Sequence, residues 1–138
     1  MFSRFSPASK RVLRAAEQEC RNRSHYYVGV EHMLLALLDE HDAAIEARLI
    51  ELGVRPIEVH AELRRCLGTG EERLWDGILI TPRVRSVVGL AETAAQDAGS
   101  AEVEPIHLLD AIVSEGQGQA SEILQRNGNI PQSRRVAG

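Results

Sequence analysis

Five histidines and two cysteines are the residues of this sequence whose side chains most readily bind metals or transfer protons. No pair of histidines has metal-binding spacing, and no His-Glu-x-x-His motif occurs. Cys20 and Cys66 lie far apart on predicted helices, and we interpret both as half-buried core thiols. No serine or cysteine arrangement typical of nucleophilic catalysis is evident. The sequence therefore predicts neither a metal site nor an enzyme.

A glycine-containing run at residues 67–71 is the nearest approach to a phosphate-binding loop. It lacks the Lys-Ser/Thr ending of a P-loop, and the carboxylates of Glu71 and Glu72 would repel phosphate. We therefore expect no bound nucleotide and no other cofactor.

Two of the histidines stand at equivalent positions in similar segments. His32 lies in the segment Val30–Leu38 and His107 in Pro105–Val113, 75 residues later. Without a gap, the same offset aligns further residues: Ser6-Pro7 with Thr81-Pro82, Val28 with Val103, Leu49 with Leu124, Gly53 with Gly128 and Pro56 with Pro131. Each of the two histidines either ties its helix start to neighbouring backbone or acts as a ligand or general base. The fixed offset indicates two copies of one unit.

Apolar periodicity and capping residues predict the helices that position these side chains. Pro7 and Pro82 follow a hydroxyl residue, which is typical of a helix start, and Gly53 and Gly128 are typical helix stops. We expect helices from Pro7 to near Arg23, over 30–40, 43–52 and 56–67, from Pro82 through Ala95, and over 105–115 and 118–127. No strand is predicted, because the apolar run at 77–80 is too short and precedes a helix cap.

The predicted fold is all-α, with two tandem four-helix repeats in a single domain covering residues 1–138. Repeat one spans 1–68, a linker spans 69–80, and repeat two spans 81–138. Trp75 either anchors the linker by packing or belongs to a partner-binding surface. The fourth helix of repeat two is truncated or absent, because only seven residues follow Pro131.

Charge and composition limit the partners. The net charge is −4 and the sequence pI is about 5.7, and the basic residues are scattered in pairs, which argues against nucleic acid. The N-terminus has no long apolar run, so neither a signal peptide nor a membrane span is predicted. Without a disulfide framework, a reducing compartment is favoured. We expect a cytoplasmic protein with no membrane partner.

Glu31 and Ser6 are candidate binding residues. Glu31 lies in the first turn of the second helix, where the helix dipole alone would favour a carboxylate. It could equally accept a guanidinium in bidentate geometry. Ser6, at the start of the first helix, could donate its hydroxyl and expose backbone N–H groups to an anion.

The two blocks resemble the amino-terminal (Clp R) repeat domain of the Clp family of AAA+ unfoldases, most closely its ClpC and ClpA/ClpB branch. The residues that carry the resemblance are Met1–Ser6, Val30–Leu38, Leu49 with Gly53, Thr81–Arg83, Ile106–Ile112, and Ala120 with Ile123, Leu124 and Gly128. The resemblance implies a non-catalytic module that recruits protein substrates or adaptor proteins to an ATP-driven unfolding ring in protein quality control. Such a module is joined to Clp ATPase domains in cis. Because this sequence holds no ATPase motif, a stand-alone regulatory or decoy protein is the alternative.

The resemblance to the ClpC-like branch also implies binding of phosphorylated arginine, with one site in each repeat. There an acidic residue before the histidine pairs with the guanidinium, and the hydroxyl helix start helps to hold the phosphate. Repeat one offers Ser6 and Glu31, whereas repeat two offers Thr81 but has Ile106 in place of the glutamate, with Glu104 two residues earlier. Because an isoleucine cannot pair with a guanidinium, we expect binding mainly in repeat one.

Overall fold

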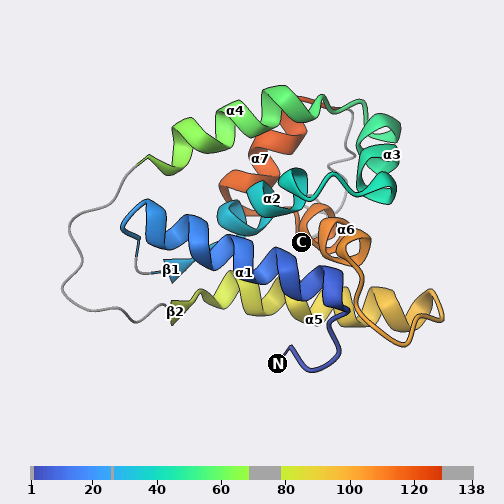
Figure 1. Ribbon diagram of the computed structural model, residues 1–138. Coiled ribbons are helices and arrows are strands. Elements are labelled where there is room, and N and C mark those ends of the chain that lie inside the picture. The colour runs from blue at the N-terminus through green and yellow to red at the C-terminus, as the bar shows by residue number, and fades with distance from the viewer. Residues whose placement is uncertain (1, 26, 69–78, 129–138) are drawn as a thin grey trace.

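The computed structural model describes residues 2–25, 27–68 and 79–128. These residues form seven helices and one pair of two-residue strands (Figure 1). In chain order the elements are α1 (Pro7–Asn22), β1 (Tyr27–Val28), α2 (Val30–Asp39), α3 (Ala43–Glu51), α4 (Pro56–Leu67), β2 (Leu79–Ile80), α5 (Pro82–Asp97), α6 (Pro105–Glu115) and α7 (Gly118–Arg126). The all-α prediction is confirmed, and each predicted helix lies close to its expected bounds. Trp75, most of the expected linker and everything from residue 129 onward lie outside the described residues.

The first helices of the two repeats begin in the same way. The Ser6 hydroxyl oxygen accepts the amide of Ser9 at 3.1 Å, and the Thr81 hydroxyl oxygen accepts the amide of Val84 at 3.3 Å. Pro7 and Pro82 occupy the first helical turn, where a missing N–H costs nothing. Each cap satisfies one backbone donor that would otherwise lack an intrahelical acceptor.

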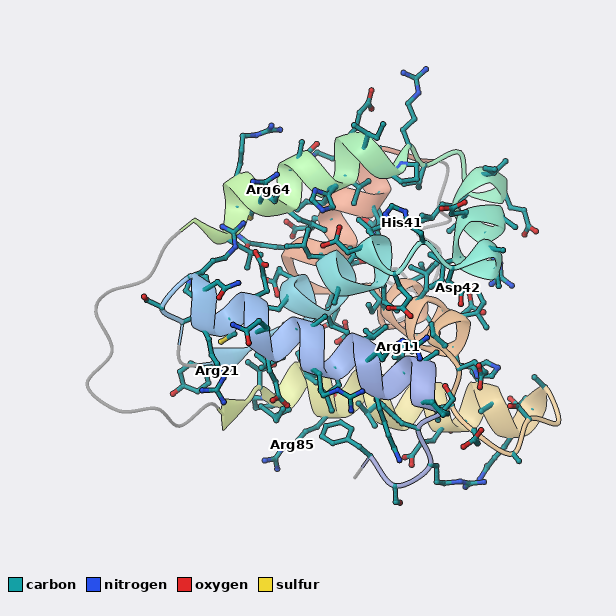
Figure 2. The ribbon with its side chains drawn as sticks, viewed as in Figure 1. Arg11, Arg21, His41, Asp42, Arg64 and Arg85 are labelled. Atoms are coloured by element: carbon teal, nitrogen blue, oxygen red, sulfur yellow. The ribbon has the colours of Figure 1, made fainter. Side chains whose placement is uncertain are left out.

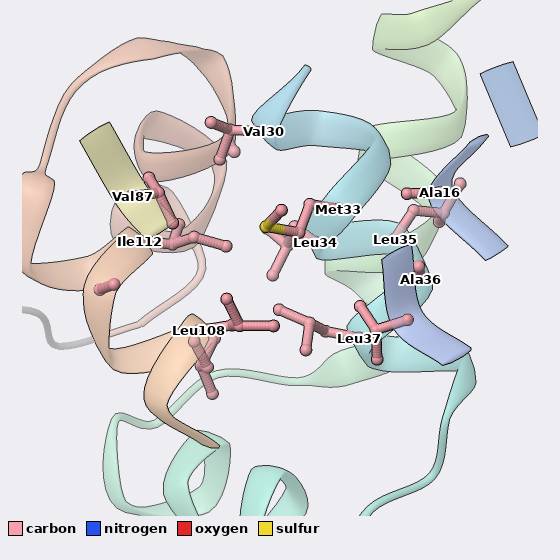
Figure 3. Packing of buried hydrophobic residues seen from close by; sticks show 14 of the residues in the cluster. Ala16, Val30, Met33, Leu34, Leu35, Ala36, Leu37, Val87, Leu108 and Ile112 are labelled. Atoms are coloured by element: carbon pink, nitrogen blue, oxygen red, sulfur yellow. The ribbon is translucent and has the colours of Figure 1, made fainter. Parts of the chain in front are cut away.

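Helix α2 lies at the centre of the molecule. It packs against α1, α4, α5, α6 and α7, and all its residues from His32 to Leu38 are buried. A helix that is apolar on nearly every side can be stable only when other elements surround it. Figure 3 shows Met33, Leu34 and Leu37 facing Leu108 and Ile112 of α6, the equivalent helix of the second repeat.

Two short parallel pairs of extended residues join distant parts of the chain. Strands β1 and β2 pair in parallel, with Val28 opposite Ile80, and an isolated parallel bridge joins Phe5 to Val103. The second pair is equivalent to the first, because Val103 lies 75 residues after Val28 and Phe5 lies 75 residues before Ile80. No strand is expected from the sequence, and these two-residue strands show that this expectation was wrong. Because these pairs form between residues at least fifty positions apart, no local sequence pattern predicts them.

Two equivalent glycines end the third helix of each repeat differently. Gly53 follows α3 with a φ of 72°, the left-handed conformation in which a β-carbon is costly. Gly128 follows α7, and its backbone lies against the carbonyl of Leu52 in the first repeat. Conformational freedom therefore explains the first glycine, and close approach explains the second.

Candidate binding site at the starts of α2 and α5

The structure does not bring Ser6 and Glu31 together. The Cys20 thiol lies 3.2 Å from the carbonyl of Tyr27, so β1 and the start of α2 lie at the C-terminal end of α1. Ser6 lies at the other end of this 16-residue helix, which is about 24 Å long. The Ser6 side chain is also buried, with 2% of its surface exposed. The two residues of repeat one therefore cannot form one small site.

Thr81 of the second repeat is the hydroxyl residue that lies near Glu31. Its amide donates to the carbonyl of Val28 at 3.2 Å, which places the start of α5 beside the start of α2. Thr81 and Glu31 are both partly exposed. The Glu31 carboxylate folds back over Gly29, where an added β-carbon would lie 3.0 Å from Oε2. The site is thus shared between the two repeats.

The residues around this candidate site carry charges of both signs. Within the part of the chain that the structure describes, the Glu31 carboxylate makes no ion pair or hydrogen bond, so it can accept a cation. Arg85 lies one turn beyond Thr81, and Figure 2 shows its side chain pointing from α5 into solvent. The positive end of the α5 dipole and this guanidinium would both attract an anion.

The counterpart of this site, at the start of α1, has no carboxylate at the matching position. There the Ser6 amide donates to the carbonyl of Val103 at 3.0 Å, as Thr81 does to Val28. Ile106 takes the place of Glu31 and packs partly buried against the core. The carboxylate is therefore present at the candidate site and absent from its counterpart.

The equivalent histidines accept equivalent hydrogen bonds. The amide of Gly29 donates to Nδ1 of His32 at 2.9 Å, and the amide of Glu104 donates to Nδ1 of His107 at 2.9 Å. Both rings are buried. A nitrogen that accepts a backbone amide has no lone pair left for a metal or for a substrate proton.

His32 has a second partner that the sequence did not reveal. Its Nε2 lies 2.8 Å from Nδ1 of His25, and the two rings meet edge to face. Because Gly29 donates to Nδ1, the His32 proton is assigned to Nε2, which donates to His25. Burial, followed by the nearby His25 charge, lowers the pKa of His32 to about 4, so the ring is neutral at pH 7. The two histidines are seven positions apart in the sequence, and this spacing predicts no contact.

The cysteines differ from each other in environment. Cys20 is buried in α1, whereas Cys66 is exposed on α4 rather than half-buried as expected. In residues 2–25, 27–68 and 79–128, no group of three or more His, Cys, Asp or Glu side chains could hold a metal ion. The helices in those ranges include none that is both long enough and apolar enough to span a membrane.

Comparison with known proteins relates most of the chain to one family. Residues 4–128 match the model of the Clp repeat (R) N-terminal domain family. The chain is 30% identical over 128 residues to the chaperone protein ClpB of Oceanobacillus iheyensis. It is 31% identical over 128 residues to the negative regulator of genetic competence ClpC/MecB of Bacillus subtilis. Each alignment covers 93% of this chain but only 16% of the relative.

Solved structures agree with this relationship in fold. The N-domain of ClpV from Vibrio cholerae superposes with a TM-score of 0.80 at 17% identity, covering 99% of this chain and 84% of that one. The N-terminal domain of ClpD from Arabidopsis thaliana superposes with a TM-score of 0.72 at 16% identity, covering 99% of this chain and 96% of that one. The resemblance noted in the sequence is confirmed: the chain belongs to the Clp repeat N-terminal domain family.

Proposed function

We propose that this chain is a docking module that recruits protein substrates or adaptor proteins to a Clp-type unfoldase and performs no chemistry itself. Family membership supports this proposal, as does the length of the relatives, of which the chain spans about one sixth. A reading frame that continues beyond residue 138 into Walker motifs would place the ATPase in cis. A frame without them would favour the stand-alone regulatory alternative.

Phosphorylated arginine is the ligand class that the shared site at Glu31 and Thr81 fits best. The observation that carries this assignment is the partly exposed Glu31 carboxylate beside the start of a 16-residue helix. A guanidinium matches the carboxylate in bidentate geometry, and a phosphate matches the N-terminal end of α5 with Arg85 one turn away. The site is assigned to Glu31 with Thr81 rather than to Glu31 with Ser6.

Calorimetric titration of the chain with free phospho-arginine tests this assignment. One site per chain is expected. Glu31→Ala should remove most of the binding, because a charge-assisted bidentate pair is lost. Ile106→Ala is the matched control at the equivalent position of repeat two and should bind as the wild type does. Equal losses from the two substitutions would overturn the asymmetry between the sites.

The wider docking role is tested with a protein that carries the modification. Arginine-phosphorylated casein should bind the immobilised chain, and unphosphorylated casein should bind far more weakly. Glu31→Ala should reduce binding of the phosphorylated form to the level of the unphosphorylated form. If both forms bind equally to the wild-type chain, the modification is not what the shared site recognises.

A further inference from the structure

A second surface lies at the opposite end of α2 from Glu31. A pocket of about 250 Å³ opens between α3 and α4, which we name the α3–α4 pocket. Its floor is formed by Ile45 and Leu49, and Ile57 forms part of its wall. Helix α2 has ten residues between the two surfaces, so they lie about 15 Å apart. A ligand at one of them does not contact the other.

One apolar side chain in the wall of the α3–α4 pocket, that of Ile57, is unusually exposed. Ile57, in the first turn of α4, has 84% of its surface exposed, and Ile50 nearby has 75% exposed. A single exposed isoleucine needs no explanation, but one that borders an apolar hollow offers area that a partner would bury. The pocket is smaller than pockets that hold drug-sized molecules, which start at about 300 Å³. Its size is enough to admit one large apolar side chain.

The rim of the pocket is acidic. Asp39, Asp42 and Glu46 border it, and no lysine or arginine is among the described residues that line it. Two histidines complete the polar rim: His60 Nε2 lies 2.8 Å from Asp39 Oδ1, and His41 Nδ1 lies 3.7 Å from Glu46 Oε1. The three carboxylates give a negative field over an apolar floor. Such a field favours a cation on the occupant.

The second repeat shows that the fold does not require these carboxylates. At the 75-residue offset, the three acidic residues are replaced by Ser114, Gln117 and Ser121. Asp42 caps α3 by accepting the amides of Ala44 and Ile45, yet α7 forms behind Gln117 without a side-chain cap. The same helical unit is therefore built with neutral residues. The acidic rim occurs in repeat one alone, so the need to form this helical unit does not explain the three carboxylates.

We propose that the α3–α4 pocket binds a segment of a partner protein through a leucine- or phenylalanine-sized side chain flanked by lysine or arginine. The apolar side chain occupies the floor and covers Ile57, and the flanking cation lies against Asp42 and Glu46. This inference rests on the docking role proposed above, but it does not depend on phospho-arginine binding at Glu31.

An NMR titration of the ¹⁵N-labelled chain with the peptide acetyl-Gly-Lys-Leu-Lys-Gly-amide tests the proposal. The expected amide shifts are confined to the end of α2, α3 and the first turns of α4. Two matched peptides, with glutamates in place of the lysines or with alanine in place of the leucine, should bind much more weakly. Binding should also weaken with added salt, because the rim charges are solvent-exposed. Equal binding of all three peptides, or shifts elsewhere, would overturn the proposal.

Variants of exposed residues separate binding from folding. Glu46→Gln removes one rim charge and should weaken binding about fivefold. Ile57→Ser removes apolar contact area and should weaken binding about tenfold. Ile50→Ser is the matched control, because it removes a similarly exposed isoleucine that borders a neighbouring hollow together with Ile57 but does not line the α3–α4 pocket. If Ile50→Ser and Ile57→Ser weaken binding equally, the pocket is not the site.

Glu31→Ala distinguishes this proposal from the phospho-arginine proposal. It should leave peptide binding unchanged while it removes phospho-arginine binding. Loss of both ligands in this variant would mean that the two surfaces are not independent, which would overturn the separate site. Peptide binding without any phospho-arginine binding would contradict only the assignment at Glu31.

Discussion

Gly128 lies so close to Val54 that a β-carbon added to the glycine would be 2.4 Å from Val54 Cγ2. The same atom would lie 2.7 Å from the carbonyl oxygen of Leu52. Gly128 follows α7 as Gly53 follows α3, so the equivalent helix ends of the two repeats meet at this point. The contact fixes the end of α7 against the residues that follow α3. One of the contacting groups is the backbone carbonyl of Leu52, which cannot move as freely as a side chain.

Gly128→Ala should destabilise the fold by about 1–3 kcal/mol, because the methyl group forces a backbone or side-chain shift in a packed contact. Gly89→Ala is the control. Gly89 lies within α5 with nothing within 4 Å of an added β-carbon, so alanine there should stabilise the helix by about 0.5–1 kcal/mol. Urea unfolding of both variants measures the difference. A Gly128→Ala variant as stable as the wild type would show that the contact relaxes freely.

Stability should fall as the pH is lowered from 6.5 to about 4, because His32 must stay neutral in the folded chain. The unfolded chain takes up the proton near pH 6.5, whereas in the fold the pKa of His32 is about 4. Between these values the unfolded state binds more protons, and the loss amounts to about 2–3 kcal/mol after allowance for partial solvent screening. Urea unfolding at a series of pH values measures it.

His32→Gln is the control for this pH dependence. Glutamine at the third helical position can still accept the Gly29 amide but does not titrate. Its stability should therefore vary less between pH 6.5 and 4 than that of the wild type. The same slope in both proteins would mean that another group is responsible.

His32→Ala should cost about 1–3 kcal/mol at neutral pH, because the Gly29 amide loses its acceptor near the buried core. The melting temperature should fall below those of the wild type and of His32→Gln. An unchanged melting temperature would refute the structural role of this ring.

Ile106→Glu should create a second phospho-arginine site at the start of α1. The backbone there matches the shared site, since Ser6 donates to Val103 as Thr81 donates to Val28. Lys10 takes the position of Arg85, so a carboxylate is the element that is missing. Calorimetry should report two sites per chain in this variant and one in the wild type. A stoichiometry that stays at one would show that the buried Ser6 end cannot admit the ligand.

The helices could be predicted because their signals are local. A hydroxyl followed by proline at Ser6 and Thr81, a run of apolar residues through α2 and a glycine after α3 each specify backbone within one or two turns. The 75-residue offset also predicts that the two halves are equivalent. The contacts Val28–Ile80 and Phe5–Val103 are related by this offset.

The composition of the site could not be predicted, because it depends on which ends of which helices meet. Pairing Ser6 with Glu31 follows from their place in one repeat, but the two residues lie at opposite ends of α1. Pairing Thr81 with Glu31 requires the contact between β1 and β2, whose two-residue strands have no pattern of their own. The His25–His32 contact is hidden for the same reason, since the two residues lie on either side of β1 rather than on one helix.

The two equivalent parallel pairs, Val28–Ile80 and Phe5–Val103, bear on how such a chain could arise. A single ancestral copy would carry both the position of Glu31 and the position of Thr81, but far apart. Two copies would have to pair before the carboxylate of one copy could lie beside the hydroxyl of the other. Fusion of the two genes makes that pairing independent of concentration. It also releases the two surfaces from being identical, and in this chain position 106 holds isoleucine where position 31 holds glutamate.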